Sequence, residues 1–467
     1  MNKQRLRRHI SFSSAALLGA LLWGALSSGC NPLTAPKASE LDAIKQSYEG
    51  RDKRSFYAYN FDTGTYYQTS AVLLAGGEDG KCAVYGEISA YVSVETARLI
   101  LEEFEQRVLP VIIGAFDPDT LLDSMDGPVI LLLLNIQDGY HPQISYTYIN
   151  GFFHYPDLYP PQPGTWYAYS NNAKLLYLDT SPQSPGSPAF YSTAAHELQH
   201  MINHLYAQRR KKQQELWIDE GLSSAAEYLY SGKHLQTHID HFNQDPYGTL
   251  RRGNTFFYWD DESNFVFDEY ATVYLFFQWL RIHAPDGAAI YRDIISSPDA
   301  DYRAITEAAK RIDPRFSSWE TLLKTWFLAN YVNYPDKEEA GGLGFLGYNG
   351  ELGLTPKTLT ELSIGLRPGE GVFSAIGTNF RPQAAADAPF IKYAGINKSG
   401  VEWWLEESLQ GDRLLTFNAN PDPRGKQEAG HLTGIGDDRS AARTAGEAVR
   451  PMPVDRMPIP RGLFPAQ

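Results

Sequence analysis

The chain has 467 residues, of which 43% are hydrophobic and 13% are aromatic, and its formal net charge is −14. A chain of this length and composition can bury a large core, and we expect two domains. The negative charge argues against a nucleic acid as partner. With two cysteines, Cys30 and Cys82, and the first of them expected to be modified, no disulfide is expected within the mature fold.

The N-terminus has the pattern of an export signal. Four basic residues among the first eight precede an apolar core at 15–26, which is too short to span a membrane as a stable helix. The string LSSGC puts a small residue before Cys30, as at a lipoprotein signal-peptidase site, although Ser27 stands where a larger aliphatic residue is usual. We expect a signal peptide over 1–29, a lipid on Cys30 and a flexible tether over 30–45, with a plain cleaved signal as the alternative. The protein would then be lipid-anchored in the bacterial cell envelope, on the periplasmic face or the cell surface.

The next part of the chain predicts strands and one helix. Residues 55–94 alternate apolar and polar side chains between Gly-containing turns, which predicts β-hairpins, with Cys82 as a small buried strand residue. Residues 94–111 have helical spacing of apolar side chains, and 128–136 and 173–179 are apolar runs of strand length.

The string AAHELQH contains the pattern HExxH, with His196, Glu197 and His200 in its fixed positions. Residues four apart lie on one helix face, so both imidazoles can bind one zinc ion while Glu197 lies beside its open position and can take a proton from water. The pattern arises by chance in about one or two per cent of chains this long, so its context matters. The context predicts a buried helix, with an apolar stripe and a cap at Ser192 or Thr193.

A third protein ligand is needed. His204 lies two turns beyond the first histidine of the motif, about 12 Å along the axis, so we expect it on the helix face or behind the ligands and not on the metal. Glu220 is the better candidate, because nineteen residues separate it from the motif and a basic, polar turn lets the chain reverse. Asp219 is expected to cap a helix that begins at Glu220. The alternative for Glu220 is a first-turn carboxylate favoured by the helix dipole.

These two segments resemble a known group of enzymes. HELQH followed by WIDEGL is similar to the gluzincin metallopeptidases, and HELQHMIN with LWIDEGLSSAAEY most resembles the hyicolysin-type family. The resemblance is strong over Ala194–Tyr230 and weak over Phe56–Gly377. It implies a zinc cofactor, with the ligands and the general base at His196, His200, Glu220 and Glu197. It also implies that Glu227 supports a ligand histidine, for which a solvated helix face is an equal alternative.

The same resemblance suggests a donor for the oxyanion. Aminopeptidase-like gluzincins place a tyrosine at the start of a comparable helix, in Y-E-x-G, and Tyr270 falls at the matching place. Ala271 and Val273 stand where that motif has Glu and Gly. Tyr274, one turn later, is the other candidate, and a packed core tyrosine is the alternative for either.

Residues 193–334 are predicted to be mainly helical. His234, His238 and His241 fall on one face of this region, either as a polar face or as a second metal site. After residue 341, short apolar segments with Gly/Pro turns predict a small β-rich domain to 420, and the composition of 421–467 predicts disorder.

The resemblance implies an α+β fold of the zincin, thermolysin-like type, with a twisted sheet, an active-site helix and a helical lower lobe. This domain would span 46–340, with a β-rich part to about 115, followed by the C-terminal β-rich appendage. The strand at 173–179 would be the edge strand that pairs with a peptide substrate. We expect zinc-dependent hydrolysis of peptides or proteins. An endopeptidase is favoured, because the G-x-M-E-N strand of aminopeptidases is absent. The alternative is a catalytically silent surface lipoprotein that acts by binding.

Overall fold

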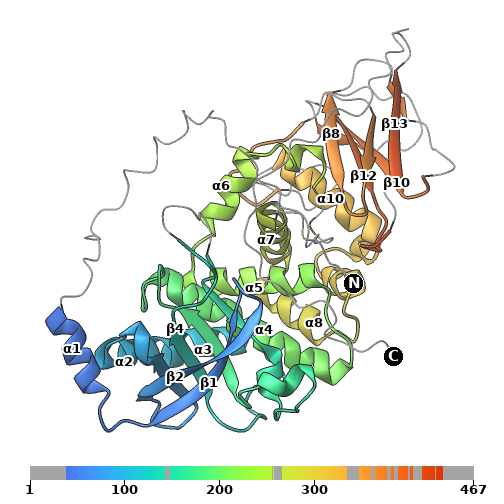
Figure 1. Ribbon diagram of the computed structural model, residues 1–467. Coiled ribbons are helices and arrows are strands. Elements are labelled where there is room, and N and C mark those ends of the chain that lie inside the picture. Colours follow the sequence, from blue (N-terminus) through green and yellow to red (C-terminus); the bar gives the residue numbers. More distant parts are fainter. Residues whose placement is uncertain are drawn as a thin grey trace, which may run out of the picture.

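The computed structural model describes residues 38–141, 148–254, 256, 266–333, 347–358, 363–375, 380–382, 388–397, 400–402, 413–425 and 428–434. The fold is mixed α+β. A curled sheet forms one end, helices form the middle, and further strands form the other end (Figure 1).

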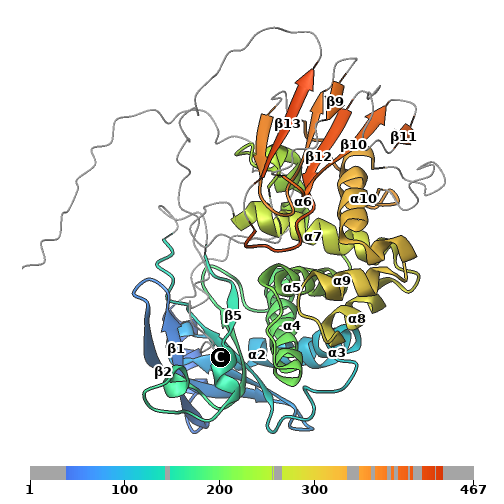
Figure 2. The same ribbon diagram turned by 90° about the vertical axis from the view of Figure 1, so that its right-hand side faces the viewer.

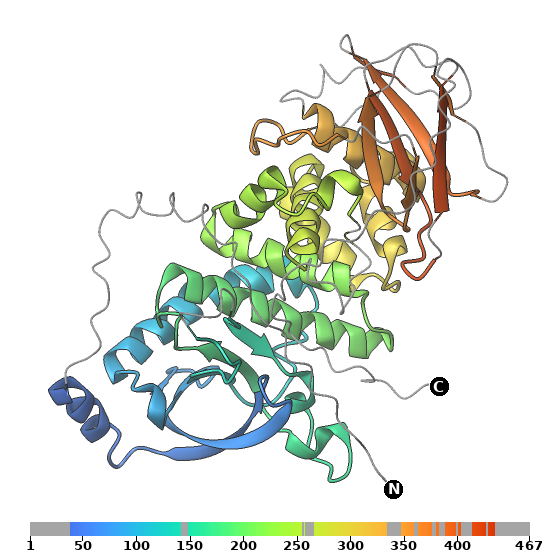
Figure 3. The same cartoon turned by 45° about the horizontal axis from the view of Figure 1, so that its top comes forward.

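The main sheet has six strands in the order β1-β2-β3-β4-β6-β5. Its strands are β1 (Lys53–Asn60), β2 (Thr65–Gly76), β3 (Cys82–Glu87), β4 (Val129–Leu134), β5 (Gly151–Phe153) and β6 (Lys174–Asp179). The pairs β3–β4 and β4–β6 are parallel and the others antiparallel. The first three strands confirm the predicted hairpins, and Figure 3 shows how strongly β1 and β2 curl. Cys82 is buried, as expected, and burial raises the pKa of its thiol to about 12.

The edge of this sheet differs from the prediction. β6, expected as the edge strand, lies between β4 and β5 and is buried along its whole length. The edge strand on this side of the sheet is β5, which is antiparallel to β6 and packs against α4 (Pro188–Arg210). Because β5 is only three residues long, it has no apolar run of strand length that could predict it. Gly151 is required there, because a Cβ would lie 2.8 Å from the carbonyl oxygen of Tyr177.

Helices cover one face of the sheet and continue beyond it (Figure 2). α2 passes through a π-helical turn at Phe104–Val108 into α3, which accounts for the predicted helical segment. α4 and α5 pack side by side, α7 packs on α5, and α6 packs on α7. The α-helices are α1 (Ala38–Ser47), α2 (Val94–Glu103), α3 (Leu109–Phe116), α4 (Pro188–Arg210), α5 (Leu216–Ser231), α6 (Gln236–Gln244), α7 (Val266–His283), α8 (Ile290–Ser296), α9 (Tyr302–Ala309) and α10 (Trp319–Val332). Short 3-10 helices are Ile88–Ala90, Tyr155–Leu158, Trp166–Tyr169, Leu250–Arg252, Gly287–Ala289 and Pro314–Ser317.

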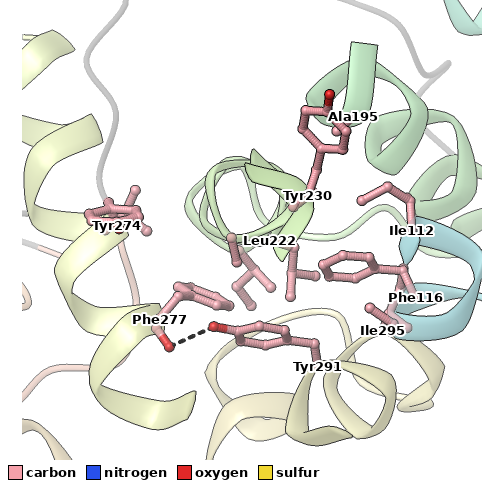
Figure 4. Close-up of a cluster of buried hydrophobic side chains, with 14 of the residues drawn as sticks. Ile112, Phe116, Ala195, Leu222, Tyr230, Tyr274, Phe277, Tyr291 and Ile295 are labelled. Carbon is pink, nitrogen blue, oxygen red and sulfur yellow. Dashed lines mark hydrogen bonds between the residues drawn. The ribbon is translucent and has the colours of Figure 1, made fainter. Parts of the chain in front are cut away.

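A continuous apolar core joins α3, α4, α5, α7 and α8 (Figure 4). Phe116, Leu222 and Tyr291 meet in its centre, and the Tyr291 hydroxyl donates to the Phe277 carbonyl oxygen at 2.9 Å. Because these contacts fix α5 between α4 and α7, they fix every side chain that α5 directs toward its neighbours.

The helices that carry HELQH and WIDEGL both begin earlier than predicted. Ser187 caps α4, and its Oγ accepts the Phe190 N–H at 3.2 Å; Ser192 and Thr193 are inside the helix. Glu215 precedes α5, so Asp219 lies in the first turn and does not cap the helix. The capping predictions were wrong because Ser, Thr and Asp are also tolerated inside a helix where they find partners other than the helix end.

The C-terminal strands form two small sheets, β11-β10-β12-β8 and β7-β13-β9. Their bounds are β7 (Ser363–Leu366), β8 (Gly371–Ala375), β9 (Phe380–Pro382), β10 (Ile391–Asn397), β11 (Gly400–Glu402), β12 (Arg413–Asn418) and β13 (Glu428–Gly434). The first sheet packs on α10, where Tyr331 and Phe373 stack with centroids 4.5 Å apart.

Two predictions of disorder are wrong in part. β13 lies inside 421–467 and pairs with β7 and β9, and α1 occupies the second half of the tether predicted over 30–45. Amino-acid composition contains no information on which backbone segments pair. Backbone pairing is what stabilises a short, weakly apolar strand such as β13. The signal segment, Cys30 and residues 435–467 lie outside the described residues.

Candidate metal centre

Three donor atoms from α4 and α5 converge at one point. Nε2 of His196 lies 3.5 Å from Oε2 of Glu220, and Nε2 of His200 lies 3.7 Å from the same oxygen. All three ligand atoms lie within 4.8 Å of one another. The helical i, i+4 spacing supplies the two imidazoles, and the packing of α5 against α4 supplies the carboxylate.

The distances between these nitrogen and oxygen atoms fit three ligands of one metal ion better than they fit hydrogen bonds between the side chains. Donors at about 2.0–2.2 Å from a tetrahedral ion lie about 3.4 Å apart, which is close to the two separations observed. Glu220 is 5% exposed, and its Oε2 has no hydrogen-bond partner. A buried carboxylate oxygen without a partner is costly unless a cation satisfies it. The donor set of two imidazoles and one carboxylate therefore fits a zinc ion.

The outward ring nitrogens of both histidines are held by carboxylates. Nδ1 of His196 lies 2.9 Å from Oε1 of Glu227, and Nδ1 of His200 lies 2.9 Å from Oδ1 of Asp219. A carboxylate on Nδ1 fixes the tautomer that presents an unprotonated Nε2 to a metal. Glu227 therefore lies against one of the two histidines, and its role as their support stays a proposal. Asp219 takes the equivalent place for the second histidine, and the sequence had suggested only a helix cap there.

Further polar side chains surround the second histidine. Asn203 Nδ2 donates to Asp219 Oδ1 at 2.6 Å, and the Ser223 hydroxyl lies 3.1 Å from His200 Nδ1. Ser223 also donates to Gln199. Both Gln199 and Ser223 are fully buried, so this network restricts the rotamers of the side chains around His200.

The electrostatics favour a cation at the convergence point. Burial disfavours charge on either imidazole, but the nearby carboxylates of Glu220 and Glu227 outweigh it and raise the pKa of His196. Burial is likewise outweighed at His200, where the charges of Asp219 and Glu220 raise the pKa to about 9. The same carboxylates that stabilise an imidazolium here would stabilise a bound metal ion, which competes with the protons.

Glu197 lies beside the ligands and is 2% exposed, and its Oε2 is buried without a hydrogen-bond partner. Burial raises the pKa of Glu197, with the charges of Glu220 and Glu227 acting in the same direction and His196 and His200 against it. A carboxyl group in this environment is suited to exchanging a proton with a water molecule.

The two candidate tyrosines of α7 differ in their partners. Tyr270 is hydrogen-bonded to Glu220, and burial together with that carboxylate raises the pKa of its hydroxyl. Tyr274 is fully buried, and its hydroxyl lies 2.8 Å from His234 Nδ1 and accepts the Leu235 N–H at 3.1 Å. Tyr270 therefore faces the metal ligands, whereas Tyr274 holds the segment before α6.

The three histidines at 234–241 do not form a second metal site. His234 stacks on Tyr228 and His241 Nε2 lies 2.6 Å from Asp268 Oδ1, while the ring of His238 lies 6.2 Å from that of Tyr270. Across the described residues, the only trio of His, Cys, Asp or Glu ligand atoms close enough for one metal is His196, His200 and Glu220. The second-metal alternative is therefore wrong for this part of the chain, because α6 begins at Gln236 and the three rings point to different partners.

His204 also lies away from the ligands. Its Nε2 lies 3.0 Å from the Tyr159 hydroxyl, and its ring stacks on Tyr155 at 4.7 Å. The helical spacing correctly separated it from the metal.

A comparison with known proteins shows the family of the chain. The chain is 30% identical over 348 residues to the neutral metalloprotease ShpI of Staphylococcus hyicus, and the match spans 72% of this chain and 74% of that protein. The chain belongs to the same metalloprotease family. No family model matches the sequence. The general activity of this protein is accordingly that of a metallopeptidase, which is the metal-dependent hydrolysis of peptide bonds in peptide or protein substrates. In this metalloprotease, the trio of His196, His200 and Glu220 is where the structure can hold the metal.

Proposed function

We propose that this metallopeptidase is a hyicolysin-type gluzincin with a zincin fold that cleaves internal peptide bonds with one zinc ion. The ligands are His196, His200 and Glu220. The observation that carries the proposal is the convergence of both Nε2 atoms on Glu220 Oε2, with a carboxylate behind each imidazole. Zinc is favoured over harder cations by the two nitrogen donors.

Zinc bound there supplies a Lewis acid that polarises the scissile carbonyl and lowers the pKa of water. Glu197 accepts the proton of the attacking water and passes it to the leaving amine. When the substrate binds, the Tyr270 hydroxyl gives up its hydrogen bond to Glu220. It then donates a hydrogen bond to the oxyanion as that charge develops. Glu227 and Asp219 keep the two imidazoles oriented.

The substrate backbone would pair with the free edge of β5. This edge strand packs against α4, the helix that carries both ligand histidines. Pairing of an extended peptide with a sheet edge fixes its backbone without specifying its sequence. An internal segment can bind in this way, which is consistent with an endopeptidase.

The test compares wild type with Glu197→Gln for zinc content and for hydrolysis of N-acetylated peptides. We expect about one zinc per chain in both proteins and turnover at least about a thousand-fold lower in the variant, since an amide cannot accept the proton. His200→Ala should lose the zinc. Equal zinc in His200→Ala and wild type would refute the ligand assignment, and hydrolysis that requires a free N-terminus would refute the endopeptidase.

We also propose that Cys30 carries a lipid and attaches the protein to the cell envelope. No helix in the described part of the chain is long and apolar enough to cross a membrane. Detergent partitioning of wild type against Cys30→Ser, with mass spectrometry of the N-terminus, tests this. An unmodified N-terminus on a wild-type protein that stays in the aqueous phase would refute the lipid.

A further inference from the structure

Three rings gather at the surface where α6 ends and α7 begins. The ring of His241 lies 6.2 Å from that of Tyr247 and 5.9 Å from that of Phe267. Tyr247 is 52% exposed and Phe267 is 43% exposed. We call His241, Tyr247 and Phe267 the aromatic cluster. It leaves apolar ring surface in water, which is the usual mark of a contact site when several such rings adjoin.

Asp268 makes the centre of the aromatic cluster rigid. Its carboxylate is buried, and Oδ1 lies 2.6 Å from His241 Nε2. Asp268 is in the first turn of α7, where the helix dipole favours a negative charge. The imidazole is therefore held in one orientation beside the two exposed rings.

The aromatic cluster lies on the same two helices, α6 and α7, as side chains beside the metal centre. On α7, Phe267 precedes Tyr270 by three residues, so the two share a face about 5–6 Å apart. On α6, His238 precedes His241 by three residues, and its ring lies 6.2 Å from that of Tyr270. Because Tyr270 is hydrogen-bonded to the ligand Glu220, a short path along paired faces of α6 and α7 joins the aromatic cluster to the metal ligands.

We infer that the aromatic cluster is a specificity subsite that receives a large apolar side chain of the peptide substrate, Phe or Leu in preference to Ala. The inference rests on the proposed function and names a determinant of its substrate class. An extended peptide advances about 3.3 Å per residue, so the side chain recognised lies a few residues from the scissile bond. Contact with the two exposed rings buries part of such a side chain, whereas Ala would leave most of the ring surface in water.

A basic substrate side chain is the competing occupant, since Asp268 and the rings could attract a cation. The contact with His241 Nε2 already occupies Asp268 Oδ1, and Asp268 is fully buried. An apolar side chain is therefore favoured, and peptides carrying Lys at the same position decide between the two.

The first experiment measures kcat/KM for N-acetylated peptides with Phe, Leu, Lys or Ala at each of three positions on either side of the cleaved bond. In wild type, one position should favour Phe over Ala by roughly ten-fold, the scale for partial burial of an apolar side chain. Phe267→Ala and Tyr247→Ala should reduce that ratio to about two-fold or less, and Phe267→Leu should retain most of it. Phe390→Ala is the matched control, since Phe390 is 39% exposed beside the C-terminal strand β10 and should leave the ratio unchanged.

The second experiment measures binding without turnover. In the Glu197→Gln background, the Kd of the Phe peptide should be roughly ten-fold lower than that of the Ala peptide, and Phe267→Ala should remove the difference. If wild type cleaves peptides but its Phe/Ala ratio is the same in Phe267→Ala, the subsite is refuted while the proposed function stands. If wild type instead prefers the Lys peptide and Phe267→Ala abolishes that preference, the subsite binds a cation. That result would overturn the inference. If a zinc-loaded wild type cleaves no peptide, the proposed function itself fails.

Discussion

Asp219 Oδ1 lies 2.9 Å from Nδ1 of His200, and it also accepts a hydrogen bond from Asn203 Nδ2 at 2.6 Å. One carboxylate oxygen thus ties the second motif histidine to a side chain one turn further along α4. Burial acts against the charge on Asp219, but His200 outweighs it and lowers the pKa of the carboxyl group. Asp219 is therefore a charged positioning residue for a ligand, one residue before the ligand Glu220.

Asp219→Asn should weaken zinc binding by roughly ten- to a hundred-fold, because a neutral amide no longer raises the basicity of the His200 imidazole. Competition with a chelator of known affinity measures the change. Asp240→Asn is the control, since it removes the same charge from an exposed side chain of α6. If the two variants bind zinc equally well, Asp219 does not tune the ligand.

Tyr270→Phe should reduce turnover by roughly a hundred-fold and leave zinc content unchanged, since only a hydrogen-bond donor to the oxyanion is lost. Tyr274→Phe should instead reduce stability by about 1–2 kcal/mol, because its hydroxyl holds His234 and the Leu235 N–H. Steady-state kinetics and thermal unfolding of both variants separate the roles. A large loss of turnover in Tyr274→Phe with an unchanged rate in Tyr270→Phe would exchange the assignments.

Gly221→Ala should destabilise the protein by about 1–3 kcal/mol through overpacking between α5 and α7. A Cβ on Gly221 would overlap the Phe277 ring and lie 2.9 Å from Val273 Cγ2. Gly114→Ala is the matched control, since a Cβ there meets nothing within 4 Å and the exchange should add up to about 1 kcal/mol of helix stability. Urea unfolding measures both, and equal stability of the two variants would contradict close packing at Gly221.

The spacing of charged and apolar residues was sufficient to predict the main features of the centre. A spacing of four positions puts the two histidines on one helix face, and the nineteen residues between His200 and Glu220 allow the chain to return to the same point. The hairpins, the strand β4 and the long helical region also followed from local periodicity. Such features depend on repeats within one segment, which the sequence displays directly.

Contacts between distant segments could not be predicted in this way. Asp219 gave the signal of a helix cap, and only the packing of α5 on α4 brings its side chain to His200. The edge position of β5 depends on the order of strands in the sheet, which the apolar run at β6 does not reveal. The histidines at 234–241 have helical spacing, but α6 begins only at Gln236, so His234 is outside the helix. His241 contacts Asp268 of α7 and not the other two histidines.

The pH dependence of stability gives a last prediction, centred on His204. Burial lowers the pKa of its imidazole to about 4, against about 6.5 in an unfolded chain. As the pH falls below about 6.5, the unfolded chain binds a proton that the folded protein excludes, so stability is lost progressively toward pH 4. At pH 5 the loss from this one residue is about 2 kcal/mol relative to pH 7.

His204→Phe should therefore flatten the pH dependence while keeping the stack on Tyr155. Between pH 7 and pH 5, the free energy of unfolding should decrease in both proteins. The decrease in His204→Phe should be about 2 kcal/mol smaller than that in the protein with His204. Urea titrations in the Glu197→Gln background avoid self-cleavage and keep every other titrating group the same. Tyr159→Phe is the control, because it removes the same hydrogen bond but leaves the buried imidazole, and with it the steep dependence. If His204→Phe keeps the steep dependence as well, the acid sensitivity arises from other groups.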